Sequence, residues 1–296
     1  MFGTNEIVGK KYFAGAPKDS LFVTSVFFTL QGEGPYAGQP CVFVRLTKCQ
    51  LDCKFCDTFF DQGDWLTYSE LYTKIVDSVR EFALNNEKVL NNFITAENKF
   101  NFGLVVTGGE PLLQSNPLAI FLESVSKQFS WTQIETNGLV KLSEEELNRL
   151  QVAKTTIVCS PKCSEKNGSY LKPPNVTLDN ADCLKFVLSA DPLSYYHKVP
   201  DWAFYWRDTT NKTIYVSPMN VYNQLPQKAK IIRLQKKGEE AISIEERSSI
   251  DEVISFWEPG LLNMEQNKLN HEYAGNYALK NCLQLSLQTH LLVSIA

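Results

Sequence analysis

The feature that most constrains the fold of this 296-residue chain is an alternation of short apolar runs with longer amphipathic stretches. Short runs rich in β-branched and aromatic residues predict strands, whereas amphipathic stretches with helical periodicity predict helices. Strands are predicted at 40–47, 102–109, 132–138, 155–162, 182–189 and 212–220, and helices at 67–85, 116–129 and 143–151. This order predicts an α/β fold, in which helices cover a mostly parallel sheet.

Small and polar residues follow directly after several of the apolar runs. The stretches "VVTGGEP", "IETNG", "VCSPK" and "YVSPM" all pass from apolar to polar in this way. The polar residues are therefore expected at the carboxyl ends of their strands, the edge at which α/β barrels and open parallel sheets bind ligands. Four such strands predict one shared site on one rim.

Two long segments fit the alternation less well. Residues 59–101 are long for one crossover, and we expect a helix followed by a surface excursion. From residue 221 on, "KAKIIRLQKKGEEAISIEERSS" has mixed charge, which is typical of a solvated face. The start of one helix is better defined, because Ser143 and Glu146 fit a capping box.

The overall charge excludes some partners. With a formal net charge of -4 and a pI near 5.6, the chain has no general positive field to hold a polyanion, which argues against a direct nucleic-acid partner. No apolar stretch reaches the length of a signal peptide core or a membrane-spanning helix. We therefore expect a cytoplasmic protein without membrane attachment.

Three of the eight cysteines fall within "KCQLDCKFCDT", at Cys49, Cys53 and Cys56. Clustered cysteines in a reducing compartment are metal ligands or catalytic groups more often than disulfides. Soft thiolates select zinc, copper(I) or iron-sulfur clusters. Structural zinc would need a fourth cysteine or histidine, and the three histidines are distant in sequence. A [4Fe-4S] cluster held by three cysteines would keep one iron open for another ligand. The other five cysteines are interpreted as small core residues.

The pattern "CQLDCKFC" resembles the signature of the radical S-adenosylmethionine (SAM) superfamily, and "TGGEP" at 107–111 resembles its glycine-rich SAM-binding stretch. More narrowly, "FFTLQGEGPYAGQPCVFVRLTKCQLDCKFCDT" at 27–58 resembles the opening of the 7-carboxy-7-deazaguanine synthase family. Further matches are "TGGEPLLQ", "ETNG", "SPK" and "LSLQTH". The resemblance implies a modified, incomplete (β/α) barrel that forms a single domain over 1–296. Residues 60–100 would be a variable insertion, and 221–280 match poorly.

The chain departs from the family pattern at three positions. Lys48 stands where the family usually has glycine, before the first cysteine. This difference bears on the loop backbone, because glycine adopts φ values that lysine disfavours. Gln284 and Leu291 replace the usual basic residues around the terminal motif, so a charged substrate contact from the C-terminal region is not expected at these two positions.

The resemblance implies conversion of 6-carboxy-5,6,7,8-tetrahydropterin to 7-carboxy-7-deazaguanine with loss of ammonia, in queuosine and 7-deazapurine biosynthesis. The implied cofactors are a [4Fe-4S] cluster, SAM and Mg²⁺. The implied partners are an electron donor such as flavodoxin or ferredoxin and a second copy of the chain in a homodimer. Two alternatives stay open at this point: another radical SAM enzyme, such as a glycyl-radical activase, and a non-catalytic zinc-binding protein.

The resemblance also assigns roles to individual residues. The cluster ligands would be Cys49, Cys53 and Cys56, and Thr58 would bind Mg²⁺ through a hard hydroxyl oxygen. The SAM-binding residues would be Phe55, Asp57, Gly108, Gly109, Glu110, Ser160, Pro161, Lys162, Ser217, Met219 and Asn220. The substrate-binding residues would be Leu30, Gln31, Gly32, Glu33, Arg45 and Thr107.

Some of these roles have a chemical basis. Gly108 and Gly109 would let a ligand approach the backbone, and Glu110 would accept a hydrogen bond from the SAM ammonium. Glu33 and Gln31 suit the donor and acceptor edge of a 2-amino-4-oxo ring. Arg45 is expected on the face of its strand opposite its apolar neighbours, where it can pair bidentately with the substrate carboxylate.

Overall fold

The computed structural model describes residues 5–56, 58–84, 86–95, 97, 99–164, 166–221 and 263–289. Its strands are β1 (Ser20–Leu30), β2 (Pro40–Leu46), β3 (Asp64–Thr67), β4 (Gly103–Gly108), β5 (Thr132–Thr136), β6 (Thr155–Cys159), β7 (Cys183–Leu188), β8 (Thr213–Pro218) and β9 (Gln284–Leu285). Its α-helices are α1 (Tyr68–Phe82), α2 (Glu87–Phe93), α3 (Ser115–Val125), α4 (Glu144–Val152), α5 (Asn175–Asn180), α6 (Asp201–Thr210) and α7 (Met264–Asn281). The short 3₁₀ helices are η1 (Lys10–Phe13), η2 (Gly34–Tyr36), η3 (Pro111–Gln114) and η4 (Ser126–Gln128).

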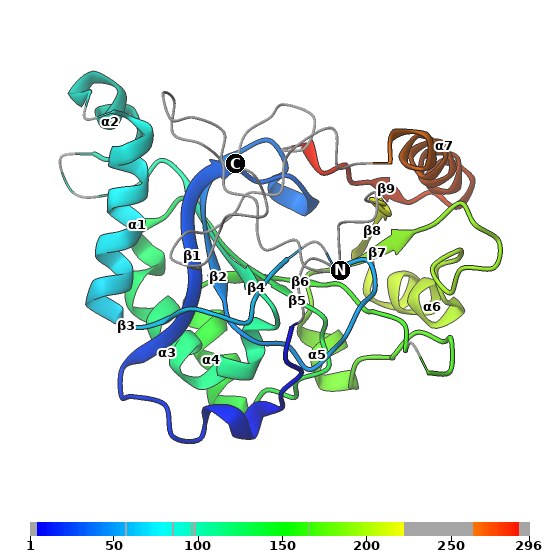
Figure 1. The fold of residues 1–296 in the computed structure, drawn as a ribbon, viewed down its shortest axis with the longest axis horizontal. Helices are drawn as coiled ribbons and strands as arrows, with labels where there is room; N and C mark the ends of the chain where they lie inside the picture. Colours follow the sequence, from blue (N-terminus) through cyan, green and yellow to red (C-terminus); the bar gives the residue numbers. More distant parts are fainter. Residues whose placement is uncertain are drawn as a thin grey trace, which may run out of the picture.

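The strands form one sheet in the order β3-β1-β2-β4-β5-β6-β7-β8-β9. Every neighbouring pair from β2 to β9 is parallel, while β1 is antiparallel to both β2 and β3. The edge strands β3 and β9 do not pair with each other, so the described strands form an open barrel with helices around its outside (Figure 1). The predicted incomplete (β/α) barrel is thus confirmed.

The barrel curves far enough for its two sides to meet across the interior. Glu33 follows β1, yet its carboxylate contacts Lys185 of β7 and Ser217 of β8. Ser286 Oγ, just beyond β9, accepts a hydrogen bond from the Gly34 N–H. Side-chain and loop contacts therefore bridge the gap that strand pairing leaves open.

Two apolar layers lie between the sheet and its helices. The larger layer packs β1 to β6 against α1, α3 and α4, and the smaller packs β7 and β8 against α6 and α7. Val44 and Leu46 of β2 point into the larger layer, as the alternation predicted, which leaves Arg45 on the interior face. In the register of the parallel strands, Arg45 lies beside Thr107.

Every strand and helix predicted from periodicity is present, with ends that differ by a few residues. The predicted capping box is also present at the start of α4. The segment 60–100 holds more regular structure than expected, because α2 follows α1 and β3 precedes it. The mixed-charge stretch that follows residue 221 lies outside the described residues. Among the helices that are described, none combines the length and apolar character needed to cross a membrane.

Candidate active site

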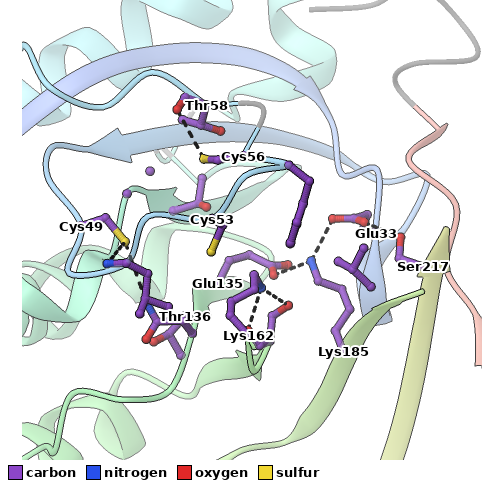
Figure 2. Close-up of a pocket in the computed structure, with 18 of the residues that line it drawn as sticks. Glu33, Cys49, Cys53, Cys56, Thr58, Glu135, Thr136, Lys162, Lys185 and Ser217 are labelled. Carbon is purple, nitrogen blue, oxygen red and sulfur yellow. Dashed lines mark hydrogen bonds and ion pairs between the residues drawn. The ribbon is translucent and has the colours of Figure 1, made fainter. Parts of the chain in front are cut away.

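One cavity lies where the ends of the parallel strands meet the loop that follows β2 (Figure 2). Its walls include the ends of β4, β5, β6 and β8, the strands that the apolar-to-polar transitions identified. The residues that these strands and their following turns contribute include Thr107, Thr136, Ser160, Ser217 and Asn220. The four strand ends therefore line one cavity, as the sequence predicted, and its use as a ligand site stays a prediction.

Residues 48–60, called the cysteine loop below, bring Cys49, Cys53 and Cys56 to this cavity. Cys49 is buried, and its Sγ accepts a hydrogen bond from the Leu51 N–H at 3.4 Å. The Cys56 N–H donates to the carbonyl of Cys53 at 3.0 Å, which forms a turn between these two cysteines. Burial, followed by the charge of Glu110, raises the pKa of Cys49 to about 12. A thiol in this setting needs a nearby cation to become a thiolate.

The three thiols fit a cluster better than a single ion. Among the described residues, no group of three or more His, Cys, Asp or Glu side chains is placed to hold one metal ion. A tetrahedral zinc would draw all its sulfur ligands to about 2.3 Å from one point. In an iron-sulfur cluster each thiolate binds a different iron, so its ligands can lie apart along one side of the cavity, as these three do.

Gly108 and Gly109 fit the end of β4 closely against the entrance of the cysteine loop. Gly108 has φ +125°, and a Cβ there would overlap the backbone of Leu46. A Cβ on Gly109 would overlap the carbonyl oxygen of Lys48. The N–H groups of Gly109 and Glu110 donate to the carbonyls of Leu46 and Lys48, at 3.0 and 2.8 Å. The absence of a side chain at both positions therefore lets protein backbone pack closely here. Both glycines also line the cavity, and the close approach of a ligand to them stays a prediction.

Glu110 lies outside the cavity lining and is fully buried. Its Oε1 accepts hydrogen bonds from the Leu112 N–H at 2.9 Å and from Thr136 Oγ1 at 2.7 Å, and its Oε2 accepts from the Asn137 N–H at 2.8 Å. Burial raises its pKa, although the three hydrogen bonds favour the charged form. The carboxylate thus joins η3 to the end of β5, and its expected contact with the SAM ammonium stays a prediction.

Other predicted ligand contacts involve groups that already have protein partners. Lys162 Nζ donates to the carbonyl and the Oγ of Ser160, both at 2.7 Å. Thr58 Oγ1 accepts a hydrogen bond from Arg45 at 3.4 Å, and the Arg45 guanidinium lies 5.2 Å from the centroid of the Phe27 ring. Thr58 and Lys162 both line the cavity.

The side of the cavity away from the cysteines holds a charge cluster, which we call the triad: the buried Lys185 and the half-buried Glu33 and Glu135 (Figure 2). Lys185 Nζ donates to Glu135 Oε2 at 2.7 Å and to Glu33 Oε2 at 2.8 Å. Two further donors orient the carboxylates. Ser217 Oγ donates to Glu33 at 2.8 Å, and Gln133 Nε2 donates to Glu135 at 2.6 Å.

The triad contains two carboxylates and one ammonium, so its carboxylates carry one negative charge more than Lys185 can balance. Burial alone would lower the pKa of Lys185, but the charges of Glu135 and Glu33 more than offset this and raise it. Burial and the charge of Glu33 raise the pKa of Glu135 in spite of Lys185. Carboxylate oxygens at this end of the cavity can accept hydrogen bonds from N–H donors on a ligand.

The structure brings most of the predicted site residues together. Those that line the cavity are Glu33, Cys49, Cys53, Phe55, Cys56, Thr58, Thr107, Gly108, Gly109, Ser160, Lys162, Ser217 and Asn220. Those that lie outside its lining are Leu30, Gln31, Gly32, Arg45, Glu110, Pro161 and Met219. Asp57 lies outside the described residues.

Two of these placements have a clear physical cause. The Gln31 side chain is 2% exposed and turns inward, where its Oε1 accepts from the Glu33 N–H at 3.2 Å. It therefore shapes the loop that presents Glu33. The ring of Phe55 packs edge-on against Tyr196, with centroids 4.9 Å apart, so this side chain has a packing role beside its predicted contact with adenosine.

Sequence reasoning missed several lining residues. The main lining residues that it did not name are Glu135, Asn137 and Lys185. Leu51, Phe60 and Gln288 also line the cavity and were not named. A signal for Lys185 was available, because a lysine inside the apolar run "CLKFVL" cannot be buried without a counter-charge. Glu135 and Asn137 belong to "ETNG", which the sequence identified as a strand end without assigning their roles.

Comparison with known proteins agrees with this geometry. The family described as "4Fe-4S single cluster domain" matches residues 30–167, which include the whole cysteine loop. The 7-carboxy-7-deazaguanine synthase of Rickettsia prowazekii is 34% identical over 197 residues, which cover 66% of this chain and 72% of that protein. The chain belongs to the 7-carboxy-7-deazaguanine synthase family.

Further relatives are more distant or cover less. The synthase of Rhodospirillum rubrum is 35% identical over 191 residues, or 64% of this chain and 66% of that protein. The solved structure of QueE from Escherichia coli is similar at 18% identity and a TM-score of 0.48, over 95% of this chain and 99% of that one. Family membership confirms the resemblance and the use of a [4Fe-4S] cluster with SAM.

Proposed function

We propose that this chain catalyses the radical SAM ring contraction of 6-carboxy-5,6,7,8-tetrahydropterin to 7-carboxy-7-deazaguanine, with loss of ammonia, in queuosine and 7-deazapurine biosynthesis. The observation that carries the proposal is one cavity with three thiols on one side and an oriented carboxylate cluster on the other. The first side suits a cluster, and the second suits a ring rich in N–H donors. Membership of the synthase family supports this assignment.

Cys49, Cys53 and Cys56 would hold the cluster by three irons. When bound and reduced, the cluster and SAM supply the radical that takes a hydrogen atom from the pterin. Ser160 and Lys162 would hold the ribose and carboxylate of SAM. Because Lys162 already donates to Ser160 over 2.7 Å, both groups are positioned before SAM arrives.

Glu33 would accept hydrogen bonds from the N–H groups of the pterin edge. Lys185 and Ser217 each donate to one of its two oxygens and so orient the carboxylate at the cavity wall. Arg45 would pair with the substrate carboxylate, with Thr107 beside it in the strand register. Movement of the Arg45 side chain from its present contact with Thr58 would accompany binding.

Several finer parts of the proposal rest on the family pattern. Thr58 would contribute a hydroxyl oxygen to Mg²⁺ at the substrate, and its place on the cavity wall supports this. Electrons would come from a flavodoxin or ferredoxin. The chain would act as a single domain over 1–296 and as a homodimer. It would work in the cytoplasm, where thiols stay reduced.

The proposed function can be tested by anaerobic incubation with SAM, a reductant, Mg²⁺ and carboxytetrahydropterin, followed by mass detection of products. We expect 7-carboxy-7-deazaguanine, and no product from a Cys53→Ala variant that has lost the iron chromophore. Deoxyadenosine without the deazaguanine would indicate another radical SAM reaction. Zinc in place of iron and sulfide would indicate a non-catalytic metal-binding protein.

A further inference from the structure

The N-terminal segment 5–8, called the strap below, lies along the cysteine loop. Ile7 forms a parallel bridge with Cys49, and the Val8 N–H donates to the Cys49 carbonyl at 2.9 Å. At the other end of the loop, Asn5 Nδ2 donates to the Thr58 carbonyl at 3.2 Å. Asn5 Oδ1 accepts from the Phe60 N–H at 3.1 Å. The strap thus touches both the first cysteine and the exit of the loop.

Lys48 joins the strap to the loop at one point. Its Nζ donates to Glu6 Oε2 of the strap at 2.8 Å and to Asp61 Oδ1, just beyond the loop, at 3.0 Å. Its own N–H donates to the Phe60 carbonyl at 2.7 Å. The ammonium also lies 5.3 Å from the centroid of the Tyr12 ring, within range of a cation–π interaction. The Glu6 N–H closes this network by donating to Asp61 Oδ1 at 2.8 Å.

Lysine is a costly residue at this position. Lys48 has φ +67°, a left-handed conformation that disfavours side chains with a Cβ, and it is only 4% exposed although it carries a charge. Glycine would avoid both costs. Outliers of this kind persist where the surrounding contacts determine them, and they point to a function of the contacts. Here the contacts fix the residue that immediately precedes the first cysteine.

The backbone of Lys48 is held as firmly as its side chain. Its carbonyl accepts from the Glu110 N–H at 2.8 Å, and Gly109 leaves no space between this carbonyl and the end of β4. Lys48 therefore connects three parts of the site: the strap, both ends of the cysteine loop and β4. We propose that Lys48 is a positioning residue that holds the cysteine loop in its cluster-binding conformation before the cluster is present.

This inference rests on the proposed function for the identity of the cluster, but its main test needs no cluster. Amide hydrogen exchange would be measured on the full-length, metal-free protein and on Lys48→Gly, Lys48→Met and Lys48→Arg variants. In the Gly and Met variants we expect about tenfold faster exchange in peptides that cover 5–8 and 49–56, with β5 and β6 unchanged. The Arg variant should restore slow exchange because it retains the charge.

The glycine variant separates the two roles of the residue, because glycine tolerates the observed φ and lacks only the side-chain contacts. Exchange like that of the wild type in Lys48→Gly would overturn the proposal. Lys212→Met is a matched control: Lys212 is half-buried and donates to the carbonyls of Asp179 and Ala181, away from the loop. It should leave exchange of the loop unchanged.

A second measurement covers the case in which Lys48 variants fail to fold. Glu6→Gln removes the negative charge that pairs with Lys48 and leaves the loop sequence intact. The Glu6 side chain is largely exposed, so this variant is expected to fold. It should also speed exchange of 49–56, and no change in a folded Glu6→Gln protein would count against the proposal.

After anaerobic reconstitution, iron and sulfide per chain should fall in Lys48→Gly and recover in Lys48→Arg. A missing deazaguanine product would refute the proposed function and leave the exchange result valid.

Discussion

At the scale of the residue, Lys185 shows how charge organises the cavity. Its side chain lies between two carboxylates that come from the loop after β1 and from β5. Ion pairs in a protein interior barely repay the cost of desolvation, but removing one partner leaves an uncompensated charge. The triad is therefore sensitive to the loss of its single cation.

Lys185→Met should lower the free energy of unfolding by about 3–5 kcal/mol, because Glu33 and Glu135 would lose the ammonium that lies between them. Urea denaturation of the metal-free protein measures this change. Lys212→Met, which removes a half-buried lysine bonded to carbonyls, should cost about 1 kcal/mol. Equal losses in the two variants would show that Lys185 does no more than an ordinary hydrogen-bonded lysine.

The pH dependence follows from the raised pKa of Lys185. An unfolded lysine loses its proton near pH 10.4, whereas the folded protein retains it, so the stabilisation by Lys185 is complete below that pH and falls above it. The difference in unfolding free energy between wild type and Lys185→Met should be constant from pH 8 to 10. It should then shrink by up to about 1.4 kcal/mol per pH unit. A difference that stays constant to pH 11.5 would contradict the buried pairing.

The sequence indicated the cysteines and Glu33 as site residues, but it did not indicate the ion pairs of Lys185 with Glu33 and Glu135. The three cysteines are close in sequence, so their spacing alone indicated a shared site. Lys185 lies 152 positions from Glu33 and 50 from Glu135, and only the curvature of the sheet brings them together. The hydrogen bonds from Thr136 and Asn137 to Glu110 were not predicted for a similar reason, because these two residues lie at the end of a different strand.

At the scale of the element, the end of β4 depends on glycine. Gly108→Ala should lower the free energy of unfolding by about 2–4 kcal/mol, because the methyl group would overlap Leu46 and the φ of +125° is strained for alanine. Gly275→Ala offers a matched control in α7, where a Cβ meets nothing within 4 Å. It should stabilise the protein by about 0.5–1 kcal/mol in the same denaturation experiment. Similar effects at both positions would rule out the steric explanation.

The helices and strands that the sequence predicted are those in which apolar residues recur at a clear helical or strand spacing. Helix α7 was not predicted, because its buried face has no large apolar residues and consists of Asn267, Asn270, Ala274 and Ala278. Its amides act as backbone partners instead: Asn270 donates to the Met219 carbonyl at 2.7 Å and accepts from the Ala190 N–H at 2.8 Å. Strand β1 was not predicted either, because both its faces are partly covered and buried residues do not alternate regularly with exposed ones along it.

At the scale of the whole molecule, the open barrel depends on contacts across its interior. Strand pairing leaves β3 and β9 as free edges of the described sheet. Glu33 nevertheless connects the β1 side to β7 and β8, and the Thr289 N–H donates to the Gly32 carbonyl at 3.3 Å. The residues proposed to bind the pterin therefore also hold the two sides of the barrel together.

This double role can be measured with a double-mutant cycle on Glu33 and Lys185. Glu33→Gln, Lys185→Met and the double variant should show a coupling of about 1–3 kcal/mol in unfolding free energy, because the two residues form one buried network. The double variant should also be more stable than the two separate losses predict, since it buries one carboxylate fewer than Lys185→Met. Additive losses within about 0.5 kcal/mol would mean that the two sides of the barrel are held together without this pair.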